Sequence, residues 1–331
     1  MIGEILNSLK NIVVLTHATD IDGVGAASLL KIKYSIPNNR LFFSSYSKEG
    51  IVYAESKFRK FYGKGFVLFV TDLSVNEPTI PVWIKIIKEI KAKGGKVFWF
   101  DHHPWSDFAV KNVAGICDAA IVGENEKFCA TEITKQELRL NTPFVNEFCK
   151  VVHFSDFNLK PDTKKHYELV KAYALSITSL TKAKSSASMQ GSLRHIAEVI
   201  ASRKFVDKKI KDEERKFEKL NTDRINKMLK NLHLVGRKVA IGFASGVQST
   251  QACGMVIKQS GRDVGIVIDP KQGKGSIRSL KSNISGLAAA LGGGGHPHAS
   301  GFELDLKKYP LGSEGGRIKL IEKIGKESSK I

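Results

Sequence analysis

The chain has 331 residues, 42% hydrophobic and 26% charged, a balance typical of a globular protein long enough for two domains. Its formal net charge of +19 favours a polyanionic partner such as nucleic acid, although a lysine-rich proteome would give the same excess. The four cysteines are scattered and form no C-x-x-C pair, which favours reduced thiols over disulfides or a zinc site. We also expect no signal peptide, no membrane contact and a cytoplasmic location.

The N-terminal half alternates short apolar runs with helical patterns. Strands are predicted at Ile12–Thr16, Leu41–Ser45, Phe66–Thr71 and Lys96–Phe100. A helix is expected from about Val24 to Lys33, opened by Asp22-Gly23, and another begins at Glu77-Pro78 and ends near 91–95. Because the strands are continuous in Val, Ile and Phe, they favour a doubly wound, mainly parallel α/β sheet covered on both faces.

The rest of the chain divides into helices and a smaller α/β domain. Helical patterns cover about 131–140 and 146–154, and the apolar stripe of 205–232 predicts one long connecting helix. The later elements expected are strands at 238–243, 264–268 and 275–277, helices at about 248–258 and 284–291, and a helix or loose tail past Leu306. We therefore predict a first domain at 1–190, a helical linker at 191–233 and a smaller α/β domain at 234–331.

Acidic and histidine residues directly follow three of the predicted strands. They are His17, Asp20, Asp22, Asp72, Asp101, His102 and His103. In open α/β sheets ligands bind beyond the carboxyl ends of the strands, so these side chains are expected at one edge. Packed carboxylates repel one another unless a cation lies among them, and imidazole with carboxylate suits a divalent metal ion. The pattern predicts a metal site, for two ions.

A single aspartate after a strand has a simpler explanation, since Asp is a preferred N-cap of the helix that follows. This alternative stays open for Asp101. Three such clusters in succession, one with Asp-x-Asp-Gly and one with paired histidines, favour the metal site for the set as a whole.

Four segments of the chain resemble the DHH phosphoesterase superfamily. Three are His17-x-x-Asp20-x-Asp22-Gly23, the strand-end Asp72 and Asp101-His102-His103; the fourth runs from Ser276-Ile-Arg278-Ser279 to the glycine-rich stretch 292–301. This last segment is similar to the DHH-associated substrate-binding domain. The superfamily includes RecJ exonucleases, nanoRNases, cyclic-dinucleotide phosphodiesterases and family II pyrophosphatases, and the length and domain pair are similar to the RecJ-like and nanoRNase-like branches.

The resemblance implies two divalent ions, with Mn²⁺ expected and Mg²⁺ or Co²⁺ as alternatives. The implied ligands are His17 and Asp20 for one ion, Asp22, His102 and Asp156 for the other, and Asp72 as a bridge between them. In many members of the superfamily, the number of residues between the first histidine and the Asp-x-Asp pair differs from the number in this chain. His17 therefore either coordinates through a different loop geometry or does not coordinate.

The resemblance also implies catalytic and substrate-binding residues. His103 would face the substrate, as a donor to a phosphate oxygen or to the leaving group, and Asp101 would orient a histidine. Backbone amides of Gly293, Gly294 and Gly295, together with Arg278 and His296, would bind the nucleotide part of the substrate. A floppy loop is the alternative for the glycine run.

These expectations lead to a metal-dependent phosphodiesterase or exonuclease that hydrolyses short or single-stranded RNA or DNA to 5′-nucleotides. The alternatives are a cyclic-dinucleotide phosphodiesterase, a pyrophosphatase, or a non-catalytic RecJ-like nucleic-acid-binding subunit of a replication complex. A non-catalytic subunit should have lost metal ligands, whereas this chain keeps nearly all of them. Replication or repair proteins are candidate partners, and a homodimer is one option for the oligomeric state.

Overall fold

A computed structural model describes residues 11–123, 127–182 and 186–329. The chain forms two compact units, Met1–Glu214 and Arg215–Ile331, called here the N-terminal and C-terminal units. The predicted boundaries at 190 and 233 stay a prediction.

The N-terminal unit is built on a five-stranded parallel sheet in the order β2-β1-β3-β4-β5. Its strands are β1 (Asn11–His17), β2 (Leu41–Ser44), β3 (Phe66–Thr71), β4 (Lys96–Phe100) and β5 (Ala119–Ile121). Every residue of β2 and β3 is buried, as expected for apolar strands covered on both faces. The predicted α/β class with a doubly wound parallel sheet is confirmed.

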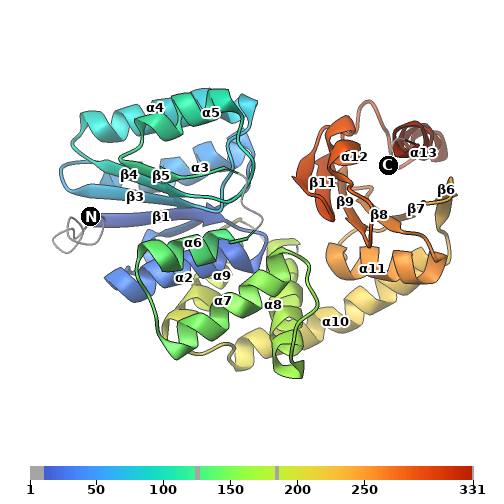
Figure 1. The fold of residues 1–331 in the computed structure, drawn as a ribbon, viewed down its shortest axis with the longest axis horizontal. Coiled ribbons are helices and arrows are strands. Elements are labelled where there is room, and N and C mark those ends of the chain that lie inside the picture. Colours follow the sequence, from blue (N-terminus) through green and yellow to red (C-terminus); the bar gives the residue numbers. More distant parts are fainter. Residues whose placement is uncertain (1–10, 124–126, 183–185, 330–331) are drawn as a thin grey trace. The chain divides into compact units, whose positions relative to one another are not determined.

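Helices cover both faces of this sheet (Figure 1). One layer contains α3 (Lys48–Phe58), α4 (Ile80–Ala92) and α5 (Asp107–Asn112). The other contains α2 (Ile21–Tyr34), α6 (Ala130–Glu137), α7 (Pro143–Asp156), α8 (Lys164–Lys182) and α9 (Ser186–Ala201). The helix α2 follows β1 into one layer, whereas α4 follows β3 into the other, so the connections diverge between these two neighbouring strands. In open α/β sheets, the carboxyl ends of such a strand pair are where ligands bind.

Two helix starts differ from their sequence predictions. The first helix begins at Ile21 rather than near Val24, since Asp20 is its N-cap and accepts a hydrogen bond from the Gly23 amide. The segment at Glu77-Pro78 forms a single 3₁₀ turn, η3 (Glu77–Thr79), before α4 starts at Ile80. Other 3₁₀ turns are η1 (Asn38–Arg40), η2 (Arg59–Phe61) and η4 (Ala114–Ile116).

The long helix predicted within 205–232 is α10 (Lys208–Leu229), and the two units divide inside it. Its apolar stripe serves two cores. Ile210 packs into the core of the N-terminal unit, whereas Ile225 and Met228 pack into a core of the C-terminal unit.

The C-terminal unit has a mixed six-stranded sheet in the order β10-β11-β9-β8-β7-β6. Its strands are β6 (His233–Val235), β7 (Val239–Phe243), β8 (Val264–Asp269), β9 (Lys274–Ser279), β10 (Gly294–His296) and β11 (Ala299–Glu303). Its helices are α11 (Ser249–Ser260), α12 (Ser285–Ala290) and α13 (Glu314–Ser328). Only β7 and β8 pair in parallel, and the remaining neighbours are antiparallel.

None of the four cysteines forms a disulfide, and all but Cys117 are buried. Within the described ranges, no helix combines the length and apolar character needed to cross a membrane.

Candidate metal centre

Strand register places the ends of β1, β3 and β4 side by side. Thr16 is the partner of Thr71, and Thr71 is in turn the partner of Phe100. The residues that follow are His17, Asp72 and Asp101, so they leave the sheet at one edge. The two threonine hydroxyls are hydrogen-bonded to each other at 2.9 Å, which ties β1 to β3 directly below these residues.

The segment from the end of β1 to the first turn of α2 contributes three of the candidate ligands, His17, Asp20 and Asp22. Nδ1 of His17 lies 2.8 Å from Oδ2 of Asp20. The loop is tight, since a Cβ on Gly23 would lie 2.4 Å from the carbonyl oxygen of His17. Asp22 is fully buried, and its two oxygens accept hydrogen bonds from the amides of Ala130 and Thr131 at the start of α6, at 2.8 and 2.7 Å. Asp22 therefore fixes α6 as well as belonging to the cluster.

Asp72 lies between the two groups of predicted ligands. Its Oδ2 is 3.5 Å from Nδ1 of His17, while its Oδ1 is 3.8 Å from Nε2 of His102 and 3.7 Å from Nδ1 of His103. Its backbone has a φ of 52°, a left-handed conformation that Asp tolerates better than most residues. This turn directs the carboxylate to the middle of the cluster.

The segment after β4 forms the far side of the cluster. Asp101 accepts hydrogen bonds from Nδ1 of His103 at 2.8 Å and from the indole of Trp105 at 2.7 Å. The alternative that Asp101 caps the following helix is wrong, because Ser106 is the N-cap of α5.

Asp156, at the last position of α7, reaches the same cluster from the helical layer. Its Oδ2 lies 3.5 Å from Nε2 of His102, and the same nitrogen lies 3.7 Å from Oδ2 of Asp22. These contacts bring together residues that are 134 positions apart (156 − 22).

Burial and like charges disfavour the ionised form of two carboxyl groups at this edge of the sheet. Burial, then the charges of Asp20, Asp22 and Asp156, raise the pKa of Asp72 well above its usual range. Burial and the charges of Asp22 and Asp20 do the same to the pKa of Asp156. A cation at this edge would relieve that repulsion.

The pKa values of the two histidines after β4 are shifted in opposite directions. Burial, then the charge of His103, lowers the pKa of His102. Burial also disfavours protonated His103, but the charge and hydrogen bond of Asp101 outweigh it and raise the pKa of His103 to about 9. An imidazolium that faces phosphate could donate to an oxygen of the substrate.

Among the described residues of the N-terminal unit, the donor atoms form three groups, each with all atoms within 4.8 Å of one another. The groups are His17 with Asp20 and Asp72, Asp22 with His102 and Asp156, and Asp72 with Asp101 and His103. Small divalent ions hold ligands at about 2.0–2.2 Å, so opposite ligand atoms lie about 4 Å apart. Oδ2 of Asp72 and Oδ2 of Asp156 are buried without a hydrogen-bond partner among the described residues. The residues present therefore fit divalent metal ions.

Sequence reasoning missed two aromatic residues at this site. The Tyr46 hydroxyl lies 3.2 Å from Nδ1 of His17, and its ring contacts those of His17 and His103. Tyr46 comes just after β2, so the rule that located the other strand-end residues could also have found it. Trp105 had no comparable signal, because it lies four residues beyond Asp101.

In the C-terminal unit, glycines 292–295 join α12 to the β10–β11 hairpin. A Cβ on Gly293 would lie 1.9 Å from the carbonyl oxygen of Gly301, and Gly295 has a φ of 131°. A Cβ on Gly294 would meet nothing within 4 Å among the described residues. The floppy-loop alternative is wrong for this run, since Gly294 and Gly295 pair in an antiparallel ladder.

Arg278 and the histidines of this segment lie on or next to the same sheet. The guanidinium of Arg278 donates to the carbonyl of Ile277 at 2.9 Å and to the hydroxyl of Thr250 at 3.1 Å. His296 belongs to β10, and His298 lies 3.0 Å from the Ser279 hydroxyl through its Nδ1. Their predicted part in substrate binding stays a prediction.

Comparisons with known proteins identify the fold. No family model matches the chain. A search of curated proteins found no match either. Among solved structures, RecJ from Thermus thermophilus in complex with Mn²⁺ has a TM-score of 0.55 and 15% identity, over 98% of this chain and 53% of that one. The chain thus spans about half the length of that RecJ.

Two further structures match over nearly their whole length. The pGpG-specific phosphodiesterase PggH from Vibrio cholerae has a TM-score of 0.52 and 15% identity, over 96% of this chain and 100% of that one. An exonuclease RecJ bound to manganese has a TM-score of 0.52 and 16% identity, over 97% of this chain and 91% of that one. The chain shares the fold of these RecJ and PggH structures, so the resemblance inferred from the sequence is confirmed at the level of the fold.

Proposed function

We propose that this protein is a metal-dependent phosphodiesterase that hydrolyses short or single-stranded oligonucleotides to 5′-nucleotides. The observation that carries the proposal is the position of Asp72, whose two carboxylate oxygens face His17 on one side and His102 with His103 on the other. A carboxylate in this position suits a bridge between two ions. The similarity to RecJ exonucleases crystallised with Mn²⁺ supports both the reaction and the metal.

The ligand assignment of the proposal follows the donor groups. His17 and Asp20 would hold one ion, Asp22, His102 and Asp156 the other, and Asp72 both. Mixed imidazole and carboxylate donors suit Mn²⁺, with Mg²⁺ or Co²⁺ as alternatives. Bound ions would supply the positive charge that stabilises the transition state of phosphodiester cleavage.

His103 is the proposed catalytic residue among the protein's own groups. Because Asp101 accepts a hydrogen bond from its Nδ1, the ring is held in one orientation and keeps its proton at that nitrogen. The Trp105 indole holds the other oxygen of Asp101. Asp101 is then a positioning residue, and His103 would donate to a phosphate oxygen or to the leaving group.

A direct test incubates the protein with end-labelled RNA and DNA of graded length and with cyclic and linear dinucleotides, in Mn²⁺ or in EDTA. We expect Mn²⁺-dependent release of mononucleotides. Asp72→Asn should reduce the rate at least about 10³-fold, which corresponds to about 4 kcal/mol of transition-state stabilisation. Asparagine preserves the shape of the side chain and tolerates the left-handed backbone at this position.

The matched control is Asp107→Asn, which removes the same charge from an exposed position at the start of α5. It should hydrolyse the substrates at the rate of the original protein. Full activity of Asp72→Asn would contradict the bridging role. No hydrolysis of any substrate would favour the non-catalytic binding subunit.

A dinucleotide phosphodiesterase is the second candidate. It is favoured by the match to PggH, a phosphodiesterase specific for pGpG, which covers all of that chain. In the same assay, this candidate predicts that dinucleotides are cleaved faster than longer oligomers. Cytoplasmic location and replication or repair partners stay predictions.

A further inference from the structure

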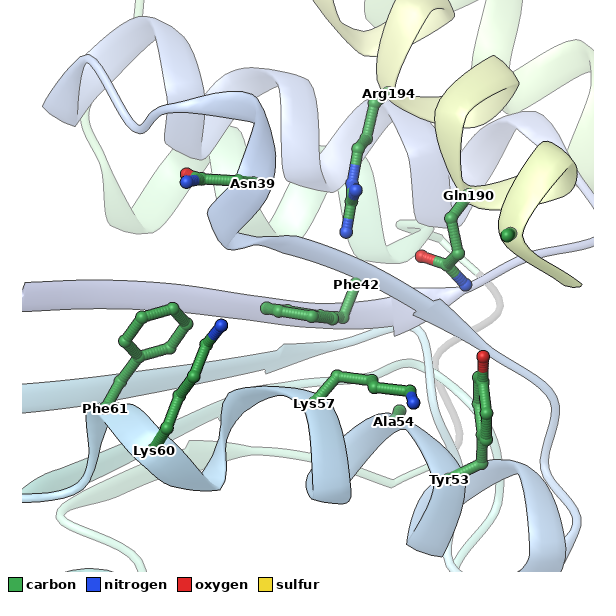
Figure 2. Close-up of a pocket in the computed structure, with 10 residues that line it drawn as sticks. Asn39, Phe42, Tyr53, Ala54, Lys57, Lys60, Phe61, Gln190 and Arg194 are labelled. Atoms are coloured by element: carbon green, nitrogen blue, oxygen red, sulfur yellow. The ribbon is translucent and has the colours of Figure 1, made fainter.

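A second candidate binding site lies along the free edge of the N-terminal sheet. There β2, the edge strand, forms the floor of a cavity of about 340 Å³ between α3 and α9 (Figure 2). We call it the β2-edge groove. Its lining residues are Asn39, Phe42, Tyr53, Ala54, Lys57, Lys60, Phe61, Ala187, Gln190 and Arg194.

The polar backbone of this edge is already occupied. The Gln190 side chain accepts a hydrogen bond from the Phe43 amide at 3.0 Å and donates one to the Phe43 carbonyl. Arg194 donates to the carbonyl of Leu41 at 2.8 Å. An added peptide strand would need these same backbone groups, so the groove does not suit a β-strand ligand.

The groove is cationic. Lys57, Lys60 and Arg194 line it, and no carboxylate is among its lining residues within the described chain. Both lysines are exposed, and each lies near an aromatic ring. The ammonium of Lys57 lies 4.7 Å from the centre of the Tyr53 ring, and that of Lys60 lies 5.2 Å from the centre of the Phe61 ring. Such a group of cations favours an anionic ligand.

Aromatic rings lie beside these cations. Tyr53, Lys57 and Lys60 follow one another along one side of α3 and the turn after it, and Figure 2 shows all three beside the groove. Tyr53 is 45% exposed, whereas Phe42 is 6% exposed and forms the floor. Exposed rings beside cations are the elements that bind the bases and phosphates of single strands.

We propose that the β2-edge groove binds a nucleotide unit of single-stranded nucleic acid, with its base on Tyr53 and its phosphates at Lys57 and Lys60. The cavity volume is at the lower end of ligand-binding pockets, which suits one nucleotide rather than a larger ligand. The choice of nucleic acid among polyanions rests on the proposed function. The groove would hold a strand apart from the metal centre, so long oligomers would bind more tightly than dinucleotides.

The experiment measures equilibrium binding of fluorescent single-stranded oligomers of 2 and 12 nucleotides to the full chain in EDTA, where no substrate is consumed. Lys57→Glu with Lys60→Glu should raise the Kd of the 12-mer at least about tenfold. It should also reduce the slope of log K against log salt by about 1.4, the value for two lost contacts to a single strand. Tyr53→Ala should raise the same Kd about fivefold or more.

Matched controls separate the groove from the general positive field. Lys85→Glu with Lys88→Glu makes the same charge change at the same spacing on α4, which belongs to the same helical layer as α3 but does not line the groove, and both lysines are exposed. Tyr167→Ala removes a ring that is still more exposed than that of Tyr53, from α8 outside the groove. Both controls should change the Kd of the 12-mer less than about threefold, and circular dichroism should show that every variant is folded.

Equal weakening by the two lysine pairs would overturn the proposal, because binding would then follow net charge. An effect of the lysines without an effect of Tyr53→Ala, together with competition by inorganic polyphosphate, would identify a plain polyanion site and also overturn it. Loss of hydrolysis in Mn²⁺ with normal oligomer binding in EDTA would contradict only the proposed function. The two proposals can therefore fail separately.

Discussion

The two units use their candidate functional residues in different ways. In the N-terminal unit, the fold leaves buried oxygens of Asp72 and Asp156 without hydrogen-bond partners among the described residues. In the C-terminal unit, Gly293 and Gly295 are required by the hairpin itself, and Arg278 donates to neighbouring groups of its own unit.

This difference separates residues that the fold requires from residues that it leaves available. At the candidate metal centre, the described residues satisfy Asp22 and Asp101 but not Oδ2 of Asp72 or Oδ2 of Asp156, and a bound cation would explain these two oxygens. In the run of glycines 292–295, Gly293 and Gly295 are explained by close backbone approach and Gly292 by its φ of 84°. Gly294 has neither explanation among the described residues, because a Cβ there meets nothing within 4 Å.

Substitution of Asp22 is expected to have the largest effect on activity and stability, because this residue is both a candidate metal ligand and a hydrogen-bond acceptor that the fold requires. Asp22→Ala removes a candidate ligand and leaves the amides of Ala130 and Thr131 buried without their acceptor. We expect a loss of activity together with a loss of about 3–5 kcal/mol of stability, from two unsatisfied buried amides. Urea unfolding in EDTA measures the second effect without metal. Unchanged stability would show that α6 does not depend on this carboxylate.

The glycine run gives a matched pair of substitutions. Gly293→Ala should destabilise the protein by about 1–3 kcal/mol or more, since its Cβ would lie 1.9 Å from the Gly301 oxygen. Gly294→Ala should leave the unfolding midpoint nearly unchanged. If the backbone at Gly294 contacts substrate, Gly294→Ala should raise the KM for oligonucleotides while the unfolding midpoint stays nearly the same. Equal destabilisation by both variants would remove the distinction between required and available glycines.

The sequence predicted the sheet and the strand-end residues because both depend on local patterns. Apolar runs predict buried strands, and the carboxyl ends of parallel strands meet at one edge. Register is not local. Nothing in the sequence indicates that Thr16, Thr71 and Phe100 are neighbours, yet this alignment brings His17, Asp72 and Asp101 together.

Other parts could not be predicted for equally physical reasons. Strands of three residues, such as β5, β6 and β10, are too short to show a periodic pattern. Asp156 lies on a helix, and only family resemblance singled it out. The close approach of Gly293 to Gly301 depends on a hairpin whose pairing the sequence does not display.

Asp72→Asn should stabilise the metal-free protein, in contrast to Asp22→Ala. The carboxylate of Asp72 is buried among other carboxylates, and burial and their charges raise its pKa well above the usual range. Neutral asparagine removes that repulsion, so we expect the metal-free variant to be more stable than the original protein. Thermal unfolding in EDTA measures the gain. Addition of Mn²⁺ should raise the Tm of the original protein more than that of the variant. A less stable variant would indicate that Asp72 has a structural partner.

The smallest expected effect concerns Asp269, a carboxylate that the C-terminal unit satisfies completely by its own groups. It accepts hydrogen bonds from the Ser245 hydroxyl at 2.6 Å and from the amides of Gly246, Lys271 and Gln272. Burial alone would raise its pKa, but the hydroxyl and amide hydrogen bonds outweigh burial and lower it. Asp269→Asn should therefore cost about 1 kcal/mol at pH 7.

The pH dependence of this cost distinguishes Asp269 from Asp72. Because the folded pKa of Asp269 is lowered, the unfolded chain binds more protons below about pH 4, and the stabilisation disappears as pH falls through the folded pKa. Urea unfolding should thus show a difference between Asp269→Asn and the original protein at pH 7 that shrinks towards pH 3. Asp223→Asn, at an exposed position of α10, is the control and should show no such difference. A constant difference across this range would mean that the hydrogen bonds do not depend on the charge of Asp269.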